Sequence, residues 1–115
     1  MTAATGRDRS GTANPPTDFR VWLDVDAEPP LVGAAGEIDL FTCAAFRHAL
    51  DDARTANPHH IALDFRHVTF MGSIGVREIS RIARGTETIE IRSPNDAVRR
   101  MLEVSGLNDE VTIVE

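Results

Sequence analysis

The chain has 115 residues, which is the size of one globular domain and too short for two packed cores. Its formal net charge is −6, and an acidic surface argues against a generic binder of nucleic acid or of anionic membranes. The single cysteine, Cys43, excludes an intramolecular disulfide, and the sequence contains no signal-peptide core and no apolar run of membrane-spanning length. We therefore expect a cytoplasmic protein whose partner is a protein or a small molecule.

The chain opens with a segment unlike the rest. Residues 1–17 are mostly small and polar, without apolar periodicity, so they cannot bury enough surface to offset their ordering entropy. We expect a disordered tail there and a single folded domain over residues 18–115. Apolar side chains alternate within residues 19–25, which predicts a first strand. Two consecutive prolines then favour a turn, after which residues 31–36 are predicted to pair back antiparallel as a hairpin.

The middle of the chain alternates between helical and strand patterns. An amphipathic helix is predicted after Thr42 and ends before Pro58, because the residue before a proline disfavours helical geometry. A buried strand over residues 60–65, a loop over residues 66–72 and a helix beginning at Ser73 follow. The expected core positions of the two helices are Phe46, Ala49, Leu50, Ala53, Val76, Ile79, Ile82 and Ala83.

The last third of the chain carries one more helix between two strands. Residues 88–92 alternate as a short strand, and residues 111–114 form the last one. Between them, Ser93 is the expected helix cap with Pro94 in the first helical position, and Gly106 is the expected C-cap. The predicted fold is α/β: one small domain with a mixed sheet and the order β-β-α-β-α-β-α-β. The expected core face of the last helix consists of Ala97, Val98, Met101 and Leu102, with apolar Leu107 after the C-cap.

One serine is placed where two chemical roles are open. The segment 69–76 joins the buried strand to the helix that begins at Ser73, and Gly72 and Gly75 permit a tight turn. A helix N-terminus presents unpaired N–H groups and the positive end of the peptide dipole. Ser73 can therefore cap the helix, or its charge can be partly stabilised there once the hydroxyl is phosphorylated. Both interpretations use the same geometry.

Three sequence motifs resemble one known family. Residues 36–39 read Gly-Glu-Ile-Asp and precede Thr42, which is similar to the G-E-[LI]-D-x-x-T opening of the STAS domain. Residues 68–76 lie where that family has a strand followed by F-[ML]-D-S-[ST]-G-L, and residues 93–107 resemble its late helix and the following S-G-L. The motifs occur in the family's order over nearly the whole chain after the tail. The chain resembles in particular the bacterial anti-sigma factor antagonists, which implies a STAS-like fold.

This resemblance implies a switch that is not an enzyme. By position, Ser73 matches the serine that a GHKL-type serine-kinase anti-sigma factor phosphorylates in that family, and a serine phosphatase reverses the step. The unphosphorylated protein would bind the anti-sigma factor and so release a sigma factor. ATP and its metal would belong to the kinase, so no cofactor is expected. The resemblance implies these partner-binding residues: Asp39, Thr69, Gly72, Ile74, Gly75 and Arg77.

The sequence departs from the family pattern at two positions, and a second function stays open. Gly72 replaces an aspartate and Ile74 replaces a second hydroxyl. A STAS module that serves as a scaffold or as an accessory subunit of a signalling or transport assembly would use Ser73 only as a cap. Arg77 and Arg81 lie one turn apart on the same helix and form a cationic stripe with Arg84. This stripe either faces solvent, or it meets an acidic partner surface or stabilises a phosphate on Ser73.

Two kinds of catalytic or metal site are disfavoured. A hydrolase nucleophile elbow requires glycine two residues before the serine, where the chain has Met71, so we expect no enzyme. The histidines and Cys43 do not have the spacing of a metal site, and no metal is expected.

Overall fold

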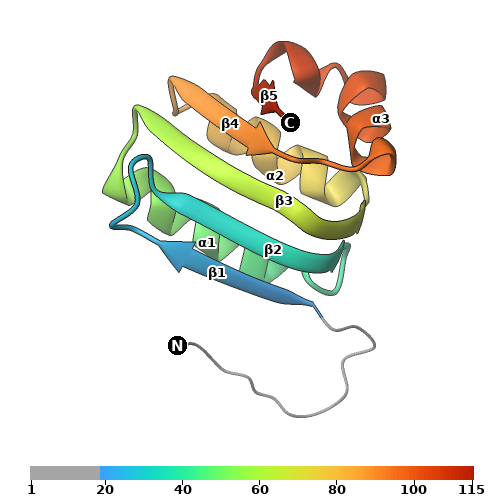
Figure 1. The fold of residues 1–115 in the computed structure, drawn as a ribbon, viewed down its shortest axis with the longest axis horizontal. Helices are drawn as coiled ribbons and strands as arrows, with labels where there is room; N and C mark the ends of the chain where they lie inside the picture. The colour runs from blue at the N-terminus through green and yellow to red at the C-terminus, as the bar shows by residue number, and fades with distance from the viewer. Residues whose placement is uncertain (1–18) are drawn as a thin grey trace.

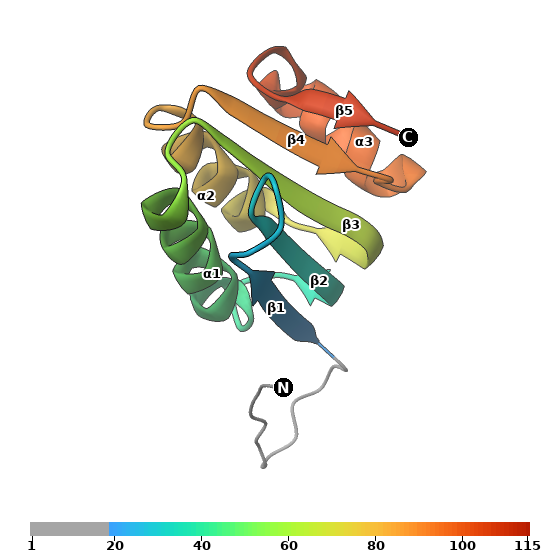
Figure 2. The same cartoon turned by 60° about the vertical axis from the view of Figure 1, so that its left-hand side comes forward.

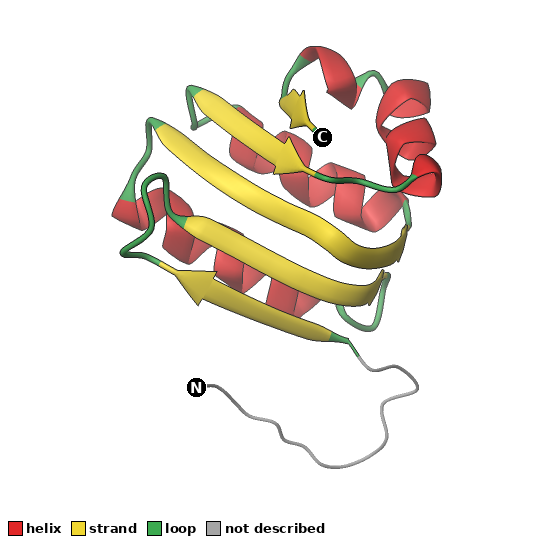
Figure 3. Cartoon of the chain, viewed as in Figure 1, coloured by secondary structure: helices red, strands yellow, loops and turns green. Residues whose placement is uncertain are grey.

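The computed structural model describes residues 19–115, so the tail predicted over residues 1–17 lies outside the described residues. Within the described part, helices and strands follow in the predicted α/β order (Figure 3). A short 3₁₀ helix, Leu107–Asp109, precedes the last strand. The strands are β1 (Arg20–Asp24), β2 (Leu31–Ile38), β3 (His60–Met71), β4 (Thr88–Arg92) and β5 (Thr112–Val114), and the α-helices are α1 (Cys43–Ala56), α2 (Ser73–Ala83) and α3 (Asp96–Ser105).

The strands of the described chain form a sheet in the sequential order β1-β2-β3-β4-β5 (Figure 1). β1 pairs antiparallel with β2, which confirms the predicted hairpin, and β2 to β5 run parallel to one another. The ends of the parallel strands therefore lie at the same edge of the sheet, which we call the carboxyl edge. Each α-helix follows a parallel strand, so the N-termini of α1, α2 and α3 lie toward this edge.

α1 and α2 lie side by side on one face of the sheet (Figures 1 and 2). Right-handed crossovers between neighbouring parallel strands place successive helices on the same face, which accounts for this arrangement. Val21 and Leu23 of β1 pack against the core, so Trp22 between them points to the opposite face. There its indole lies over Gly33 of β2, where an added Cβ would collide with the ring. Gly33 therefore makes room for the indole in the position that it occupies.

The core lies between the sheet and the helices. Phe46 of α1 packs against Phe65 of β3, with ring centroids 6.0 Å apart and ring planes inclined by 49°. The predicted core positions of α1 are all buried, and so are Ile79 and Ile82 of α2. These positions confirm the helical spacing predicted from the sequence. Their side chains hold both helices against the sheet, with the N-terminus of α2 at its carboxyl edge.

β3 is longer than the sequence predicts. The prediction of a loop over residues 66–72 is wrong, because the strand continues to Met71 and remains paired with β2. Two register shifts in this pairing break the regular alternation of buried and exposed side chains, and that alternation is the pattern from which a strand is predicted. The added strand carries the chain directly to Gly72 at the carboxyl edge. Its last pairs with β2 are Gly36 with Val68, Glu37 with Phe70, and Ile38 with Met71.

The start of α3 also differs from the prediction. Asn95 is the N-cap, and its side-chain oxygen accepts a hydrogen bond of 2.9 Å from the backbone N–H of Val98. Ser93 instead turns the chain out of β4 with a positive φ of 56°, and its N–H donates to the carbonyl of Val114 at 2.7 Å. Ser93 therefore ties the end of β4 to β5, and it lies two residues before the cap that the helix uses. Pro94 accordingly precedes the helix.

The prediction assigns too many residues of α3 to the core. Val98 and Leu102 are buried, but Ala97 is exposed, because α3 contacts the rest of the fold through a narrow stripe of side chains. The end of the helix follows the prediction: Gly106 adopts a left-handed conformation with φ 79°, and Leu107 after it is buried.

Candidate functional site

Ser73 is exposed and is the first residue of α2. The predicted helix start is confirmed, but Gly72 occupies the N-cap position, with extended backbone angles of φ −82° and ψ 178°. A cap precedes the first helical residue, so the capping role that the sequence left open for Ser73 is wrong. No side chain within residues 19–115 caps this helix. The Ser73 hydroxyl and the first N–H groups of α2 are thus presented together at the carboxyl edge.

The two glycines that flank Ser73 have different structural roles. A Cβ at Gly75 would lie 2.6 Å from Cγ of Met71 and 2.9 Å from Cγ2 of Ile38, so the helix can approach the strand ends only with glycine there. A Cβ at Gly72 would have its nearest contact at 3.6 Å, from Cε2 of Phe70, which is ordinary van der Waals spacing. Gly75 is therefore fixed by packing, whereas position 72 has room for a side chain.

The turn of residues 39–42 is closed by its own side chains. Oδ1 of Asp39 accepts hydrogen bonds from the backbone N–H groups of Phe41 at 2.9 Å and Thr42 at 3.1 Å. In return, Oγ1 of Thr42 accepts from the N–H of Asp39 at 2.9 Å and donates to the carbonyl of Glu37 at 2.8 Å. This reciprocal bonding explains the D-x-x-T spacing of the sequence motif. Asp39, which the sequence predicts to bind a partner, orders the turn that leads into α1.

The 39–42 turn lies beside the start of α2. The N–H of Gly72 donates to the carbonyl of Ile38 at 2.9 Å, so the residues next to Ser73 and Asp39 are directly bonded to each other. The structure thereby brings together two of the predicted site residues that are distant in the sequence.

Three large apolar side chains are exposed around this junction. Leu40 and Phe41, within the 39–42 turn, are 75% and 84% exposed, and Phe70 at the end of β3 is 45% exposed. We call these three residues the apolar edge patch. Sequence reasoning missed them as functional residues. The available signal was the pair of bulky apolar residues between Asp39 and Thr42, in a turn where polar residues are usual.

The arginines of the predicted cationic stripe on α2 differ in their ion pairing. Arg81 donates to Asp51 of α1 at 2.9 Å and to Glu78 of its own helix at 2.9 Å, so its charge ties the two helices together. Arg77 is exposed, and no ion pair involving it or Arg47 of α1 occurs among residues 19–115. These two arginines, each one turn into its helix, remain as the exposed cations near the carboxyl edge.

Cys43 begins α1 and is buried, with only 6% of its surface exposed. Burial raises the pKa of its thiol, and the nearby Glu78 carboxylate adds to that effect. Arg47 and Arg77 act in the opposite direction on the same pKa, which places both guanidinium groups near this thiol. A raised pKa favours the neutral thiol, the less reactive form of cysteine.

The remaining predicted site residues lie at the same edge with different exposure. Thr69 is exposed, and its carbonyl accepts a hydrogen bond of 3.3 Å from the side-chain amide of Asn95, which ties the start of α3 to β3. Ile74 is half-buried and Gly75 is buried. Among the expected partner contacts, Thr69, Ser73 and Arg77 therefore present the exposed side chains.

The two histidines at the start of β3 lie beside carboxylates. His59 pairs with Glu87 at 2.9 Å and His60 with Glu90 at 3.1 Å, and residues 19–115 hold no group of three or more His, Cys, Asp or Glu side chains suited to a metal. No helix in this part of the chain combines the length and the apolar character needed to cross a membrane.

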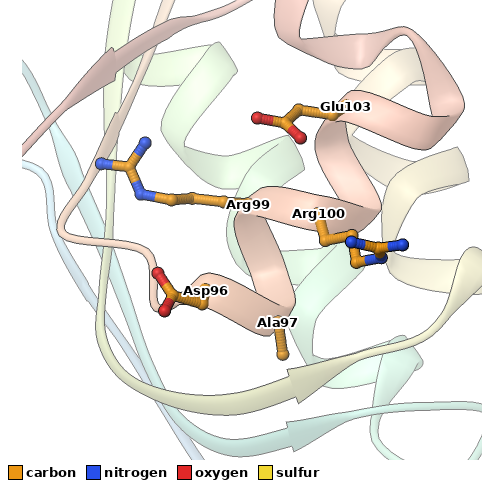
Figure 4. A pocket seen from close by; sticks show the side chains of 5 residues that line it. All are labelled: Asp96, Ala97, Arg99, Arg100 and Glu103. Atoms are coloured by element: carbon orange, nitrogen blue, oxygen red, sulfur yellow. The ribbon is translucent and has the colours of Figure 1, made fainter.

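A hollow of about 450 Å³ lies along α3 and is separate from the Ser73 junction (Figure 4). Its lining side chains come from α3 alone, and none of the predicted site residues contributes to it. One of them, Arg99, also forms an ion pair with Glu115. The lining residues are Asp96, Ala97, Arg99, Arg100 and Glu103.

The fold resembles solved structures of anti-sigma factor antagonists. An anti-sigma factor antagonist from Mycobacterium paratuberculosis superposes with a TM-score of 0.77 and 21% identity, over 89% of this chain and 90% of that one. The anti-sigma factor antagonist SpoIIAA, in its unphosphorylated form, superposes with a TM-score of 0.65 and 17% identity, over 84% of this chain and 88% of that one. At these identities the likeness is one of fold.

A curated protein and a family model match the sequence itself. The anti-sigma-F factor antagonist RsfB of Mycobacterium tuberculosis is 36% identical over 47 residues, which span 41% of this chain and 38% of that protein. This chain therefore matches well under half the length of its relative. A family model described as "Mlab, STAS domain" matches residues 22–115, which cover the whole of the sheet beyond the first residues of β1 and all of the helices. On this match, the chain belongs to the STAS domain family.

Proposed function

We propose that the protein is an anti-sigma factor antagonist of the cytoplasm, which binds a GHKL-type serine-kinase anti-sigma factor and so releases a sigma factor. The observation that carries the proposal is the exposed Ser73 hydroxyl at the uncapped N-terminus of α2, beside an ordered turn and exposed apolar side chains. The fold of solved antagonists and the name of the curated relative support it. The chain contributes a docking surface and a phosphoacceptor, and no catalysis.

Phosphorylation of Ser73 is the proposed off-switch. The kinase would transfer the γ-phosphoryl group of ATP to Oγ of Ser73, which loses its proton while ADP leaves, and a serine phosphatase would hydrolyse the ester. The phosphate would carry about −1.5 to −2 charges at neutral pH. The N-terminus of α2, which no side chain of the described residues caps, and the guanidinium of Arg77, at i+4 on the helix, would stabilise that charge in the free protein.

The same charge would oppose binding of the partner. An interface closed over Ser73 would have to bury the phosphate, and an unmatched buried charge costs several kcal/mol, enough for about a thousandfold loss of affinity. A single covalent step on an exposed hydroxyl is thus sufficient to dissociate the complex.

The test uses the purified GHKL-type serine kinases encoded by the source genome. We expect one of them to bind the wild type, to label it with radioactive phosphate from ATP, and to leave Ser73→Ala unlabelled. Ser73→Glu should bind at least a hundredfold more weakly in calorimetry, since it places a negative charge in the closed interface. The matched control is Thr55→Glu at the exposed end of α1, distant from the carboxyl edge, which should bind as the wild type does. Equal binding of Ser73→Glu and wild type would contradict the switch.

A second candidate function is a STAS scaffold or an accessory subunit of a signalling or transport assembly. Gly72 and Ile74 favour it, because they stand where the antagonist motif has an aspartate and a second hydroxyl, and the description of the matching family model is compatible with it. In that case Ser73→Glu and Ser73→Ala should both retain the partner set of the wild type, and no kinase should label the protein.

A further inference from the structure

The 39–42 turn combines two properties that rarely occur together in a surface loop. Its backbone is fixed by four side-chain hydrogen bonds, two accepted by Asp39 and two made by Thr42. Yet Leu40 and Phe41, the two residues that these bonds enclose, are 75% and 84% exposed. Holding large apolar side chains in water brings no stability to the fold. A turn that is ordered while its apolar side chains are displayed is instead prepared for binding, since little conformational entropy remains to be lost.

The surroundings of the turn define the chemistry of what would cover it. Phe70 lies next to the start of α2, because its Cε2 would be 3.6 Å from a Cβ at Gly72, and it is 45% exposed. Arg47 and Arg77 are exposed near the same helix starts and form no ion pair with any residue of 19–115. The carboxylates of Glu37 and Asp39 lie at the same turn, so the two guanidinium groups, unpaired within the described chain, are cations at the side of the patch formed by the starts of α1 and α2, in a protein whose net charge is −6.

We propose that Leu40 and Phe41 are a preformed anchor that enters an apolar pocket on the partner protein, and that carboxylates at the rim of that pocket face Arg47 and Arg77. The inference rests on the proposed function for the identity of the partner, the serine-kinase anti-sigma factor. It assigns to Asp39 a positioning role, because Asp39 acts on the partner through the conformation of the turn.

The first experiment measures affinity by calorimetry with the kinase that binds the wild type. Phe41→Ser should weaken binding about thirtyfold or more, the loss typical of a central apolar anchor. Val104→Ser on α3 is the matched control, because Val104 is 77% exposed and lies outside the apolar edge patch, and it should bind within about twofold of the wild type. Arg77→Glu should slow association and reduce its dependence on salt. Unchanged affinity of Phe41→Ser would overturn the anchor.

The second experiment does not depend on the identity of the partner. The photoreactive residue p-benzoylphenylalanine replaces Phe41, or Val104 as the control, in the full chain in its native host, and crosslinked peptides are identified by mass spectrometry. Position 41 should crosslink to a protein other than this chain, at a peptide with apolar residues flanked by Asp or Glu, and position 104 should not. A crosslink from position 41 to a second copy of the chain, or none at all, would overturn the proposal.

The two proposals fail in different ways. If the crosslinked protein is not a kinase and Ser73→Glu still binds it, the switch is wrong while the anchor stands. If the kinase binds and labels Ser73 but Phe41→Ser binds as tightly as the wild type, the anchor is wrong while the switch stands.

Discussion

Gly72 and Gly75 flank the same serine, yet only one of them is required by packing. At Gly75 the helix approaches Met71 and Ile38 so closely that an added methyl group has no room. At Gly72 the backbone is extended and the nearest atoms lie at ordinary contact distance. A side chain at position 72 is therefore compatible with the fold, and the glycine found there affects the chemistry around Ser73 more than it affects the backbone.

Gly75→Ala should lower the free energy of unfolding by about 1–2 kcal/mol, because overpacking outweighs the gain in helix propensity. Gly72→Ser, the control, should change it by less than about 0.5 kcal/mol, since serine fits and is a good N-cap. Urea denaturation at constant m-value measures both. A Gly75→Ala variant as stable as the wild type would show that α2 can shift away from the strand ends.

At the scale of secondary-structure elements, hydrogen bonds in the connections at the carboxyl edge order the surface around Ser73. The 39–42 turn is bonded within itself, Gly72 is bonded to Ile38, and Asn95 is bonded to the end of β3. The starts of α2 and α3 are thereby tied to the end of a neighbouring strand, and the start of α1 is held by the turn that precedes it. The surface that surrounds Ser73 is accordingly an ordered one.

Asp39→Ala removes the acceptor of two backbone N–H groups in the 39–42 turn. The amide protons of Phe41 and Thr42 should then exchange with solvent at least tenfold faster, and the free energy of unfolding should fall by about 1 kcal/mol. Asp39→Asn keeps an oxygen acceptor and should retain most of the protection. Native-state hydrogen exchange followed by NMR resolves the individual amides. Protection that survives in Asp39→Ala would mean that the backbone bonds alone hold the turn.

At the scale of the whole molecule, much of the fold could be predicted because local signals agreed with it. The hairpin, the parallel order and the stripes of α1 and α2 follow from alternation, prolines and helical spacing, all of which the sequence displays directly. The second half of β3 could not be predicted, because register shifts against β2 replace its alternation. The sequence shows two bulky apolar residues between Asp39 and Thr42 but does not give their exposure, since burial depends on which other segments cover a turn.

The face of the sheet opposite α1 and α2 carries an acid-sensitive ion pair. Glu90 of β4 hydrogen-bonds Arg92 at 2.9 Å, and this bond lowers the pKa of its carboxyl group, against an opposing effect of burial and with a smaller contribution from His60. Folding therefore favours ionised Glu90. Its contribution to stability is present above the ordinary carboxyl range and is lost as the pH falls through the lowered pKa.

Glu90→Gln should therefore be less stable than the wild type at about pH 6, and the difference should begin to shrink below about pH 4, because the unfolded state takes up its proton there while the folded state takes it up only at the lowered pKa. Thermal unfolding at a series of pH values measures the difference. Glu103→Gln, an exposed carboxyl on α3, is the control for a general loss of negative charge. A Glu90→Gln difference that stays constant from pH 6 to below pH 4 would contradict the ion-pair effect.

Trp22 is the chain's single tryptophan, and its indole rests over Gly33 on the face of the sheet opposite α1 and α2. The molecule thus carries a natural optical reporter on the β1–β2 hairpin, while the surface around Ser73 contains phenylalanine but no indole among the described residues. Fluorescence from this reporter follows the loss of the hairpin on unfolding. No tryptophan lies at the Ser73 surface itself. The assembly and the disassembly of a complex there are therefore best observed through a label or through the partner's own chromophores.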